Sequence, residues 1–196
     1  MKKITILIAF LFSVSLFSQQ FSRPNKDTFV VSMTGDPNNT ALQLYQNIDE
    51  VTASDTDFVY SADKDATTFQ HTISNLTDPL VATGHIVRCR ISKSDGGVPN
   101  NSSGSTSTVA IRLMQSTTPI ATIRAAAAVT TWEDVSYTLS AAEANSITEY
   151  FNLEIEYVIV GGAGSPSNRR GVAISWAEME VPSPVVATRN RVHVIN

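Results

Sequence analysis

The stretch LEIEYVIV, residues 153–160, decides the fold, because large apolar side chains occupy every second position from its start. Glu154 and Glu156 fill positions between them. Successive side chains of a β-strand point to opposite faces, so this spacing gives one dry face and one wet face. The stretch therefore predicts a strand of an antiparallel sheet that packs one face on a core.

The same two-residue period recurs along the chain. The apolar residues that share a parity are Val87, Cys89 and Ile91; Val109, Ile111 and Leu113; Val135, Tyr137 and Leu139; and Val172, Ile174 and Trp176. Further strands are expected at 28–34, 57–61 and 67–74, with turn-rich segments between them. About eight to ten such strands predict an all-β fold, an antiparallel β-sandwich of jelly-roll-like form. Trp176 is interpreted as a core residue.

One short helix interrupts the β pattern near residues 141–151. Ser140 and Glu143 fit a capping box, in which each side chain satisfies a backbone N–H group at the start of a helix. Ile147 with Tyr150 or Phe151 has the spacing of an apolar stripe, so the helix is expected to cover one end of the sandwich. The alanine run 125–128 is interpreted as strand or connection, because no capping residue precedes it.

The N-terminus has the features of an export signal. Lys2 and Lys3 precede an apolar run at 6–12, and polar residues follow at 18–20. The predicted organisation is a signal peptide at 1–19, a β-sandwich domain at 20–184, and a terminal strand or tail at 185–196. Cleavage is expected near residues 18–20, with an uncleaved anchor as the alternative. The domain is expected to be exported or extracellular.

Charge and cysteine content exclude several classes of protein. The formal net charge is −4 and the 14 Lys and Arg residues are scattered, which argues against a nucleic-acid binder. Cys89 is the only cysteine, so no disulfide within the chain is possible, and its place on a predicted strand indicates a buried, inert thiol. The histidines have no metal-ligand spacing and no Gly-x-Ser-x-Gly motif occurs, so no catalytic residue is assigned.

Four aspartates are weak candidates for a structural calcium site. Asp55, Asp57, Asp63 and Asp65 lie close together in expected loops, where carboxylate oxygens could converge on a hard cation. The full twelve-residue calcium loop is absent, and the alternative is that these residues form turns. No other cofactor is expected.

Aromatic side chains provide the best candidates for ligand binding. Trp132 precedes a strand beside Asp134, and Tyr45 and Tyr60 lie near other expected turns. Exposed aromatic rings stack on the apolar faces of sugars and on peptide surfaces. The alternative for Trp132 is burial or packing at a sheet edge. The pair at 169–170, Arg169 and Arg170, is expected in a solvated hairpin turn, with contact to an acidic partner as the alternative.

Four motifs resemble uncharacterised β-sandwich proteins from tailed-phage structural gene clusters, over about residues 44–181. They are Leu44-Tyr45-x-x-Ile48-Asp49-Glu50, Asp55-x-Asp57-Phe58, Gly84-His85-x-Val87-Arg88-x-Arg90, and Leu139-Ser140-x-x-Glu143-Ala144-x-x-Ile147-Thr148-x-Tyr150-x-x-Leu153. The resemblance implies a virion-associated, non-enzymatic decoration, tail or adhesion component. An export leader departs from that pattern and raises the alternative of a secreted bacterial surface protein.

Three functions therefore remain open. The first is a structural or adhesion protein on a virion surface, with protein partners in an assembly. The second is a secreted bacterial carbohydrate-binding module that contacts surface glycans. The third is a hydrolase whose site forms only in the fold. An exposed apolar patch or an unprotected edge strand would also indicate a homo-oligomer.

Overall fold

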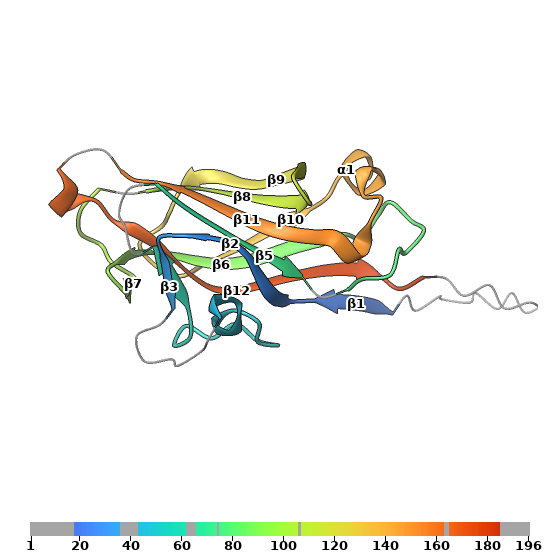
Figure 1. Cartoon of the computed structure of the whole chain (residues 1–196), viewed down its shortest axis with the longest axis horizontal. Coiled ribbons are helices and arrows are strands. Elements are labelled where there is room, and N and C mark those ends of the chain that lie inside the picture. Colours follow the sequence, from blue (N-terminus) through green and yellow to red (C-terminus); the bar gives the residue numbers. More distant parts are fainter. Residues whose placement is uncertain are drawn as a thin grey trace, which may run out of the picture.

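The computed structural model describes residues 18–35, 43–61, 66–73, 75–105, 107–162 and 165–184. Figure 1 shows two layers of strands, with β8, β9 and β11 on one side and β6 and β12 on the other. The predicted signal peptide lies outside the described residues up to position 17, and so does the predicted tail at 185–196. Among the residues that are described, no helix is both long and apolar enough to cross a membrane.

Each layer is one antiparallel sheet. The first sheet runs in the order β10-β6-β12-β4-β3, with β1 added to β12 and β7 to β6. Its strands are β1 (Gln19–Ser22), β3 (Met33–Gly35), β4 (Val59–Ser61), β6 (Ile86–Asp95), β7 (Val98–Pro99), β10 (Glu133–Thr138) and β12 (Gly171–Pro182). The second runs β2-β5-β11-β8-β9. It contains β2 (Pro24–Val31), β5 (Thr67–Ile73), β8 (Thr108–Gln115), β9 (Thr118–Ala127) and β11 (Leu153–Val160).

This arrangement confirms the predicted antiparallel sandwich. Strand β11 pairs antiparallel with β5 and β8, and its alternate residues Leu153, Ile155, Tyr157 and Ile159 are buried, as the two-residue period predicts. Residues 125–127 of the alanine run 125–128 belong to β9 and Ala128 follows the strand, which confirms the interpretation as strand or connection. Strand β1 begins at Gln19, so residues next to the predicted cleavage point pair with the end of β12.

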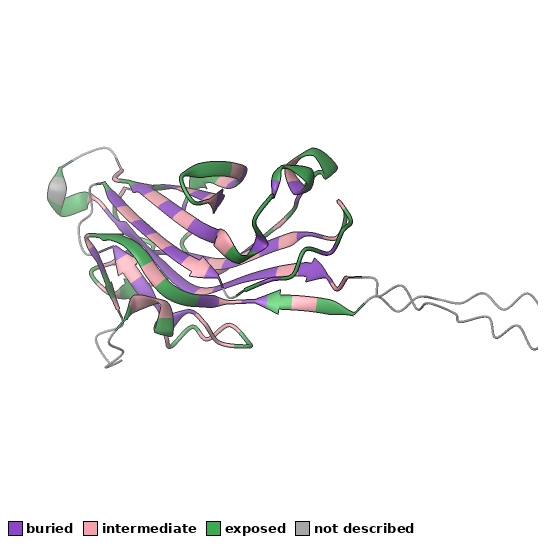
Figure 2. Cartoon of the chain, turned by 45° about the vertical axis from the view of Figure 1, so that its right-hand side comes forward, coloured by how far each residue is buried: buried purple, intermediate pink, exposed green. Residues whose placement is uncertain are grey.

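The core fills the space between the two inner faces. Figure 2 shows buried and partly buried residues alternating along the central strands, which is the pattern of a sheet with one dry face. The rings of Phe69 and Tyr157 stack with centroids 6.0 Å apart, and His71 lies 5.8 Å from Tyr157. Burial lowers the pKa of His71 to about 4, so this residue is a neutral member of an aromatic cluster.

One polar contact joins the two sheets through the core. The Tyr157 hydroxyl on β11 donates to the Cys89 Sγ atom on β6 at 3.3 Å. Both side chains are fully buried, which confirms the expected burial of the thiol. Burial raises the pKa of Cys89 to about 12, because a thiolate would lose its solvation in the core.

The helix is confirmed but is shorter than predicted. Helix α1 (Ala141–Ser146) has the expected capping box between Ser140 and Glu143. The α-helix ends at Ser146, because the backbone N–H groups of Thr148 and Glu149 donate to the Gln115 side chain instead of to the helix. A separate 3₁₀ turn, η2 (Tyr150–Asn152), then leads into β11.

The interpretation of Trp176 as a core residue is wrong. On β12, Ile174 pairs with Ile91 but Trp176 pairs with the next residue of β6, Arg90, so Ser175 is an extra residue. A bulge of one residue reverses the inward and outward positions of the strand that follows it. Trp176 therefore points to the outer face, while Ala177 takes a buried position.

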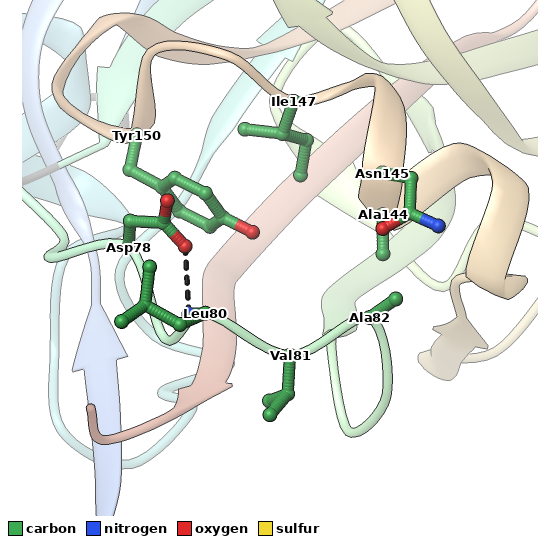
Figure 3. A pocket seen from close by; sticks show the side chains of 8 residues that line it. All are labelled: Asp78, Leu80, Val81, Ala82, Ala144, Asn145, Ile147 and Tyr150. Carbon is green, nitrogen blue, oxygen red and sulfur yellow. Dashed lines mark hydrogen bonds between the residues drawn. The ribbon is translucent and has the colours of Figure 1, made fainter. Parts of the chain in front are cut away.

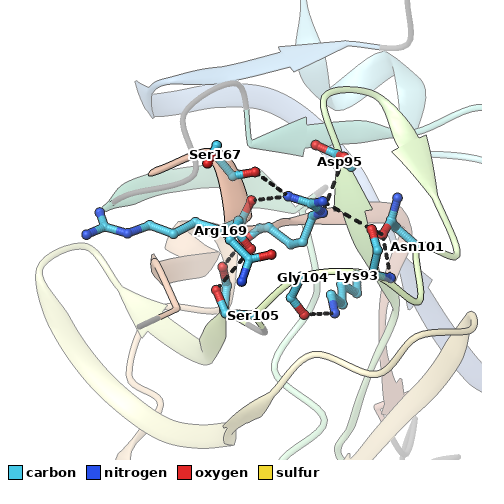
Figure 4. A network of polar contacts seen from close by, with 11 residues as sticks. Lys93, Asp95, Asn101, Gly104, Ser105, Ser167 and Arg169 are labelled. Atoms are coloured by element: carbon cyan, nitrogen blue, oxygen red, sulfur yellow. Dashed lines mark hydrogen bonds and ion pairs between the residues drawn. The ribbon is translucent and has the colours of Figure 1, made fainter. Parts of the chain in front are cut away.

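Arg170, the second residue of the arginine pair at 169–170, is also different from expectation. Arg170 is only 8% exposed, and its guanidinium lies 3.2 Å from Asp95 and donates to Ser103 at 3.1 Å and to two backbone carbonyl groups. Nearby, Lys93 is 2% exposed and donates from Nζ to the Gly104 carbonyl at 2.8 Å (Figure 4). These contacts tie the loops at this end of the sandwich, so Arg170 is structural, not a solvated turn residue.

The edge strand β2 meets the condition for self-association stated above. It pairs with β5 on one side, and its order places it at the end of the second sheet. Phe29, Val30 and Val31 are exposed on it. Exposed apolar edge strands favour pairing with another chain. Homo-oligomer formation remains a prediction.

The buried thiol gives a first testable prediction. Cys89 should not react with a thiol reagent in the native protein at pH 8, because a pKa of about 12 leaves only on the order of 10⁻⁴ of it as thiolate and the core excludes the reagent. Labelling in a denaturant series should follow the unfolding transition measured by fluorescence. Rapid labelling before that transition would contradict the packing described above.

Candidate functional site

An open groove of about 640 Å³ crosses the outer face of the first sheet. Strands β1, β6 and β12 form its floor, and residues 51–53 form one wall. Two aromatic residues line it: Phe21, whose side chain is 50% exposed, and the half-buried Trp176. Four further lining residues are charged: Arg88, Glu178 and Glu180 on the strands, and Arg23 between β1 and β2.

Strand register places these side chains on one surface. Phe21 of β1 lies opposite Glu180 of β12, and Glu178 lies opposite Arg88 of β6. Side chains at alternate positions of a strand share a face, so Trp176 joins Glu178 and Glu180 on the outer side after the bulge. The grouping is therefore a property of three paired strands and not of a loop.

The charged residues form a continuous row of ion pairs. Glu178 accepts from Arg23 through Oε2 and from Arg88 through Oε1, the latter at 3.4 Å. Arg88 also donates to Glu180. Two guanidinium groups and two carboxylates thus balance in charge, and mutual pairing fixes the orientation of their planar groups. A guanidinium carries N–H donors and a carboxylate carries only acceptors, so this row presents both kinds of polar group along the groove.

The wall at 51–53 belongs to a segment that fills a gap along β12. Strands β1 and β4 pair with different parts of the same edge of β12. Between them, the Ala177 N–H donates to the Ile48 carbonyl at 3.2 Å, and the Trp176 Nε1–H donates to the Glu50 carbonyl at 2.9 Å. This segment follows the 3₁₀ turn η1 (Leu44–Asn47). Trp176 is therefore held in place by Glu50, the residue that precedes the wall.

Trp132 and Asp134, both predicted as binding residues, lie on the neighbouring part of this face. The Arg90 guanidinium lies 5.9 Å from the centre of the Trp132 ring, and the Trp132 ring meets Phe58 edge-on with centroids 6.2 Å apart. Arg90 donates to both carboxylate oxygens of Asp55 at 2.6 and 2.9 Å and to Asp134 at 2.7 Å. Trp132 is half-buried and packed, as its alternative interpretation states.

The two predicted tyrosines occupy different surroundings. Tyr60 on β4 lies 6.2 Å from Phe58, which connects it to the Trp132 cluster, and its ring packs over Gly97. Tyr45 lies on η1, where its backbone N–H and that of Leu44 donate to the Asp27 carboxylate. Trp132, Asp134 and Tyr60 thus belong to one cluster through Phe58 and Arg90. A ligand-binding role for any of the four stays a prediction.

Carboxylates gather in the segment at 49–57, as the sequence indicates. The partner of Asp55 is an arginine and not a metal ion. Both oxygens of Asp55 are bonded to Arg90. Burial raises the pKa of Glu50 to about 7, and the neighbouring carboxylate of Asp57 adds to this shift through its charge and a hydrogen bond. Asp63 and Asp65 lie outside the described residues. Within the described ranges, no three His, Cys, Asp or Glu side chains gather as metal ligands would.

Two carboxylates line the groove, the number that glycoside hydrolysis uses. Glu178 and Glu180 are both engaged by guanidinium groups. Glycoside hydrolysis needs one carboxyl group to protonate the leaving oxygen and a second to act as base or nucleophile. Both carboxylates of the groove are held in ion pairs along its floor.

Sequence reasoning missed most of this groove. Phe21 lies just past the predicted signal peptide, and the two-residue period predicts a core position for Trp176. Arg88 and Glu178 alternate with core residues on their strands, so their outward direction was predictable. Their meeting was not, because it depends on which strands pair and in which register.

No family model matches this chain, and no curated protein matches its sequence. Among solved structures, one similar chain is the CBM51 of Clostridium perfringens GH95, in complex with methyl-galactose. That match has 9% identity and a TM-score of 0.33, and covers 85% of this chain and 90% of the other. It carries no argument about a ligand here.

Replacement of Trp132 separates packing from binding. We expect Trp132→Ala to lower the free energy of unfolding by about 2 kcal/mol, because it removes the contacts with Phe58 and Arg90. Trp132→Phe should lose less than half of that. Urea unfolding measures both. Unchanged stability in Trp132→Ala would contradict a packing role and return this residue to the ligand candidates.

The Glu50 carboxyl gives a pH dependence of known sign. A carboxyl group with a pKa of about 7 in the folded protein and 4.5 when unfolded binds its proton more tightly in the native state. Stability should therefore fall as the pH rises from 4.5 to 7. Because the side chain is half-exposed, we expect a loss on the order of 1 kcal/mol.

Glu50→Gln isolates this effect. The variant keeps the backbone carbonyl that holds Trp176, and its amide can donate to Asp57. The difference in unfolding free energy between variant and wild type should shift in favour of the variant as the pH rises from 4.5 to 7. His71 and the other titrating groups contribute equally to both proteins. A difference that stays constant over this pH range would refute the assignment.

Proposed function

We propose that this protein is a non-enzymatic binding module that holds a neutral carbohydrate in the groove on the outer face of its first sheet. The observation that carries the proposal is the combination of Phe21 and Trp176 with a charge-balanced row of Arg and Glu side chains. Sugars have an apolar C–H face and a rim of hydroxyl groups. The groove offers a complement to each.

The aromatic residues provide the apolar contact. An aromatic ring is large, rigid and able to stack on a C–H face. Phe21 is half-exposed although it lies on a paired strand, so it presents ring surface that the fold does not cover. Trp176 is fixed by its hydrogen bond to the Glu50 carbonyl. Little side-chain freedom is then lost on binding, which favours affinity.

The polar residues provide the orientation. Hydroxyl groups donate and accept hydrogen bonds, so they match a surface that contains both guanidinium donors and carboxylate acceptors. The lining contains two arginines and two glutamates, so no net charge from these side chains attracts a phosphate or a polyanion. The volume of about 640 Å³ lies within the range of small-ligand sites.

A glycan array followed by calorimetry tests the proposal with matched variants. Phe21→Ala should weaken binding of any sugar found by about tenfold, because it removes stacking without disturbing the core. The matched control is Phe29→Ala: Phe29 is 51% exposed, close to the 50% of Phe21, but lies on β2 of the other sheet. It should leave the affinity within twofold.

Trp176→Phe serves as the second variant. It keeps a ring in the groove but loses the indole N–H bond to the wall, so we expect weaker binding with the fold retained. Equal affinity in wild type, Phe21→Ala and Trp176→Phe would exclude this groove as the site. Absence of any sugar signal across the array would remove the carbohydrate proposal itself.

Virion association and adhesion remain a second proposal that rests on the sequence resemblance alone. An adhesion component could use the same groove to contact a glycan on a cell surface. Purification of particles followed by mass spectrometry tests it. Repeated absence of the chain from assembled particles would exclude virion association and leave the proposal of a secreted binding module.

A further inference from the structure

A second cavity, of about 300 Å³, opens at the end of the sandwich that carries α1. One side is the loop with Asp78, Leu80, Val81 and Ala82, and the other comes from the end of α1 and the turn after it. Figure 3 shows Asp78 beside the ring of Tyr150, with Asn145 across from them. It shares no lining residue with the groove on the sheet face.

A buried polar pair lies behind this cavity. The Tyr150 hydroxyl and the His85 Nε2 atom are 2.7 Å apart, and His85 has no exposed surface. Burial lowers the pKa of His85, so its imidazole is neutral at pH 7. Tyr150 is 7% exposed, and burial together with the charge of Asp78 raises its pKa to about 12. The phenol is therefore protonated, and it lines the cavity.

The cavity presents more acceptors than donors. Whichever atom of the Tyr150–His85 pair donates, the phenol oxygen keeps at least one lone pair for a ligand. The Asp78 Oδ1 atom accepts from the Leu80 N–H at 2.8 Å, which leaves lone pairs on the carboxylate. Asn145 adds an amide that both donates and accepts. A ligand rich in N–H or O–H donors matches this set.

The charge of the lining further restricts the chemical class of ligand that the cavity can bind. Asp78 is the only charged residue among the eight that line the cavity, so its carboxylate has no cation within the site. The lining therefore carries a negative charge, in contrast to the balanced groove. We propose that this cavity binds an amino sugar, with its protonated primary amine between Asp78 and the Tyr150 oxygen and its hydroxyl groups toward Asn145.

The three features of the site each correspond to part of such a ligand. A primary ammonium has three donors, which suit the carboxylate and phenol oxygens. A single pyranose ring suits a cavity near the lower limit of small-ligand sites. Leu80 and Val81 are exposed apolar residues at the rim, and the ring of Tyr150 adds an apolar surface inside.

Three sugars that differ at one position provide the probe. Glucosamine, N-acetylglucosamine and glucose are titrated into the full-length protein at pH 6.5 and low ionic strength, with chemical shifts of the backbone amides as readout. We expect glucosamine to shift the amides of residues 78–82 and 145–150. We expect N-acetylglucosamine and glucose to bind at least tenfold more weakly, because neither carries the charge that Asp78 attracts.

Asp78→Asn is the decisive variant. It keeps the Oδ1 acceptor for the Leu80 N–H group and removes only the charge, so the loop should retain its conformation. Glucosamine affinity should fall at least tenfold. The matched control is Glu149→Gln, which removes a negative charge from an exposed residue near this end but outside the cavity lining. It should change the affinity less than twofold.

Tyr150→Phe tests the second contact. It leaves the buried His85 without its partner, so its folding is measured by thermal unfolding before titration. Equal binding of glucosamine and glucose, or unchanged glucosamine affinity in Asp78→Asn, would overturn the proposal. Loss of binding in Phe21→Ala but not in Asp78→Asn would place the sugar in the groove instead. The experiment can therefore reject the proposal for the cavity without rejecting the proposal for the groove, and the reverse.

Discussion

The register shift at Ser175 is the constraint on which the outer face of the protein depends. Strand β12 is the longest strand and pairs with β6 along most of its length. Before the shift, Val172 and Ile174 face the core; after it, Ala177 and Met179 do. A continuous two-residue period would have put Trp176 inside and left Ala177 outside. One extra residue thus converts a bulky apolar side chain from core filling to groove lining.

The same shift brings opposite charges together. With the register after Ser175, Glu178 meets Arg88 across the pair of strands, and Glu180 follows on the same face. Without the shift, these two glutamates would point into the interlayer space, where an unpaired carboxylate is very costly. The bulge therefore satisfies the glutamates as well as exposing the indole. Ion pairs across the outer face and apolar burial on the inner face require the same register.

The sequence predicted the regular part of this structure and missed the irregular part. Alternation in 153–160 indicated a half-buried strand because a sheet face is a local property of each strand. Ser140 and Glu143 indicated the helix start for the same reason. The helix end was misplaced because Gln115, distant in sequence, accepts the N–H groups that would continue it. Trp176 was misplaced because a bulge is a property of two paired strands.

The binding candidates illustrate the same division. Residue type and position identify Trp132 and Asp134, and both lie at the surface. Arg90, however, contacts the Trp132 ring and donates a hydrogen bond to Asp134. Phe21 lies at the start of the predicted domain, before the first expected strand, and only its pairing with β12 shows that it belongs to the sandwich. A sequence pattern shows which residues are suited to bind. Tertiary contacts decide which of them are free to do so.

The groove on the first sheet and the cavity near α1 differ in how their residues are held in position, and this determines which ligands each can recognise. The aromatic and glutamate side chains of the groove lie on paired strands, and the glutamates are in ion pairs with arginines. The geometry of the groove is therefore set before a ligand binds, which favours a rigid, uncharged ligand. The cavity near α1 depends on a loop in which Leu80 has a φ of 58°, a backbone conformation unusual for leucine. Asp78 bonds to the N–H of that residue. A cation that binds Asp78 would therefore contact the same carboxylate that accepts the Leu80 N–H bond. Binding of a positively charged ligand is thus linked to the conformation of this loop.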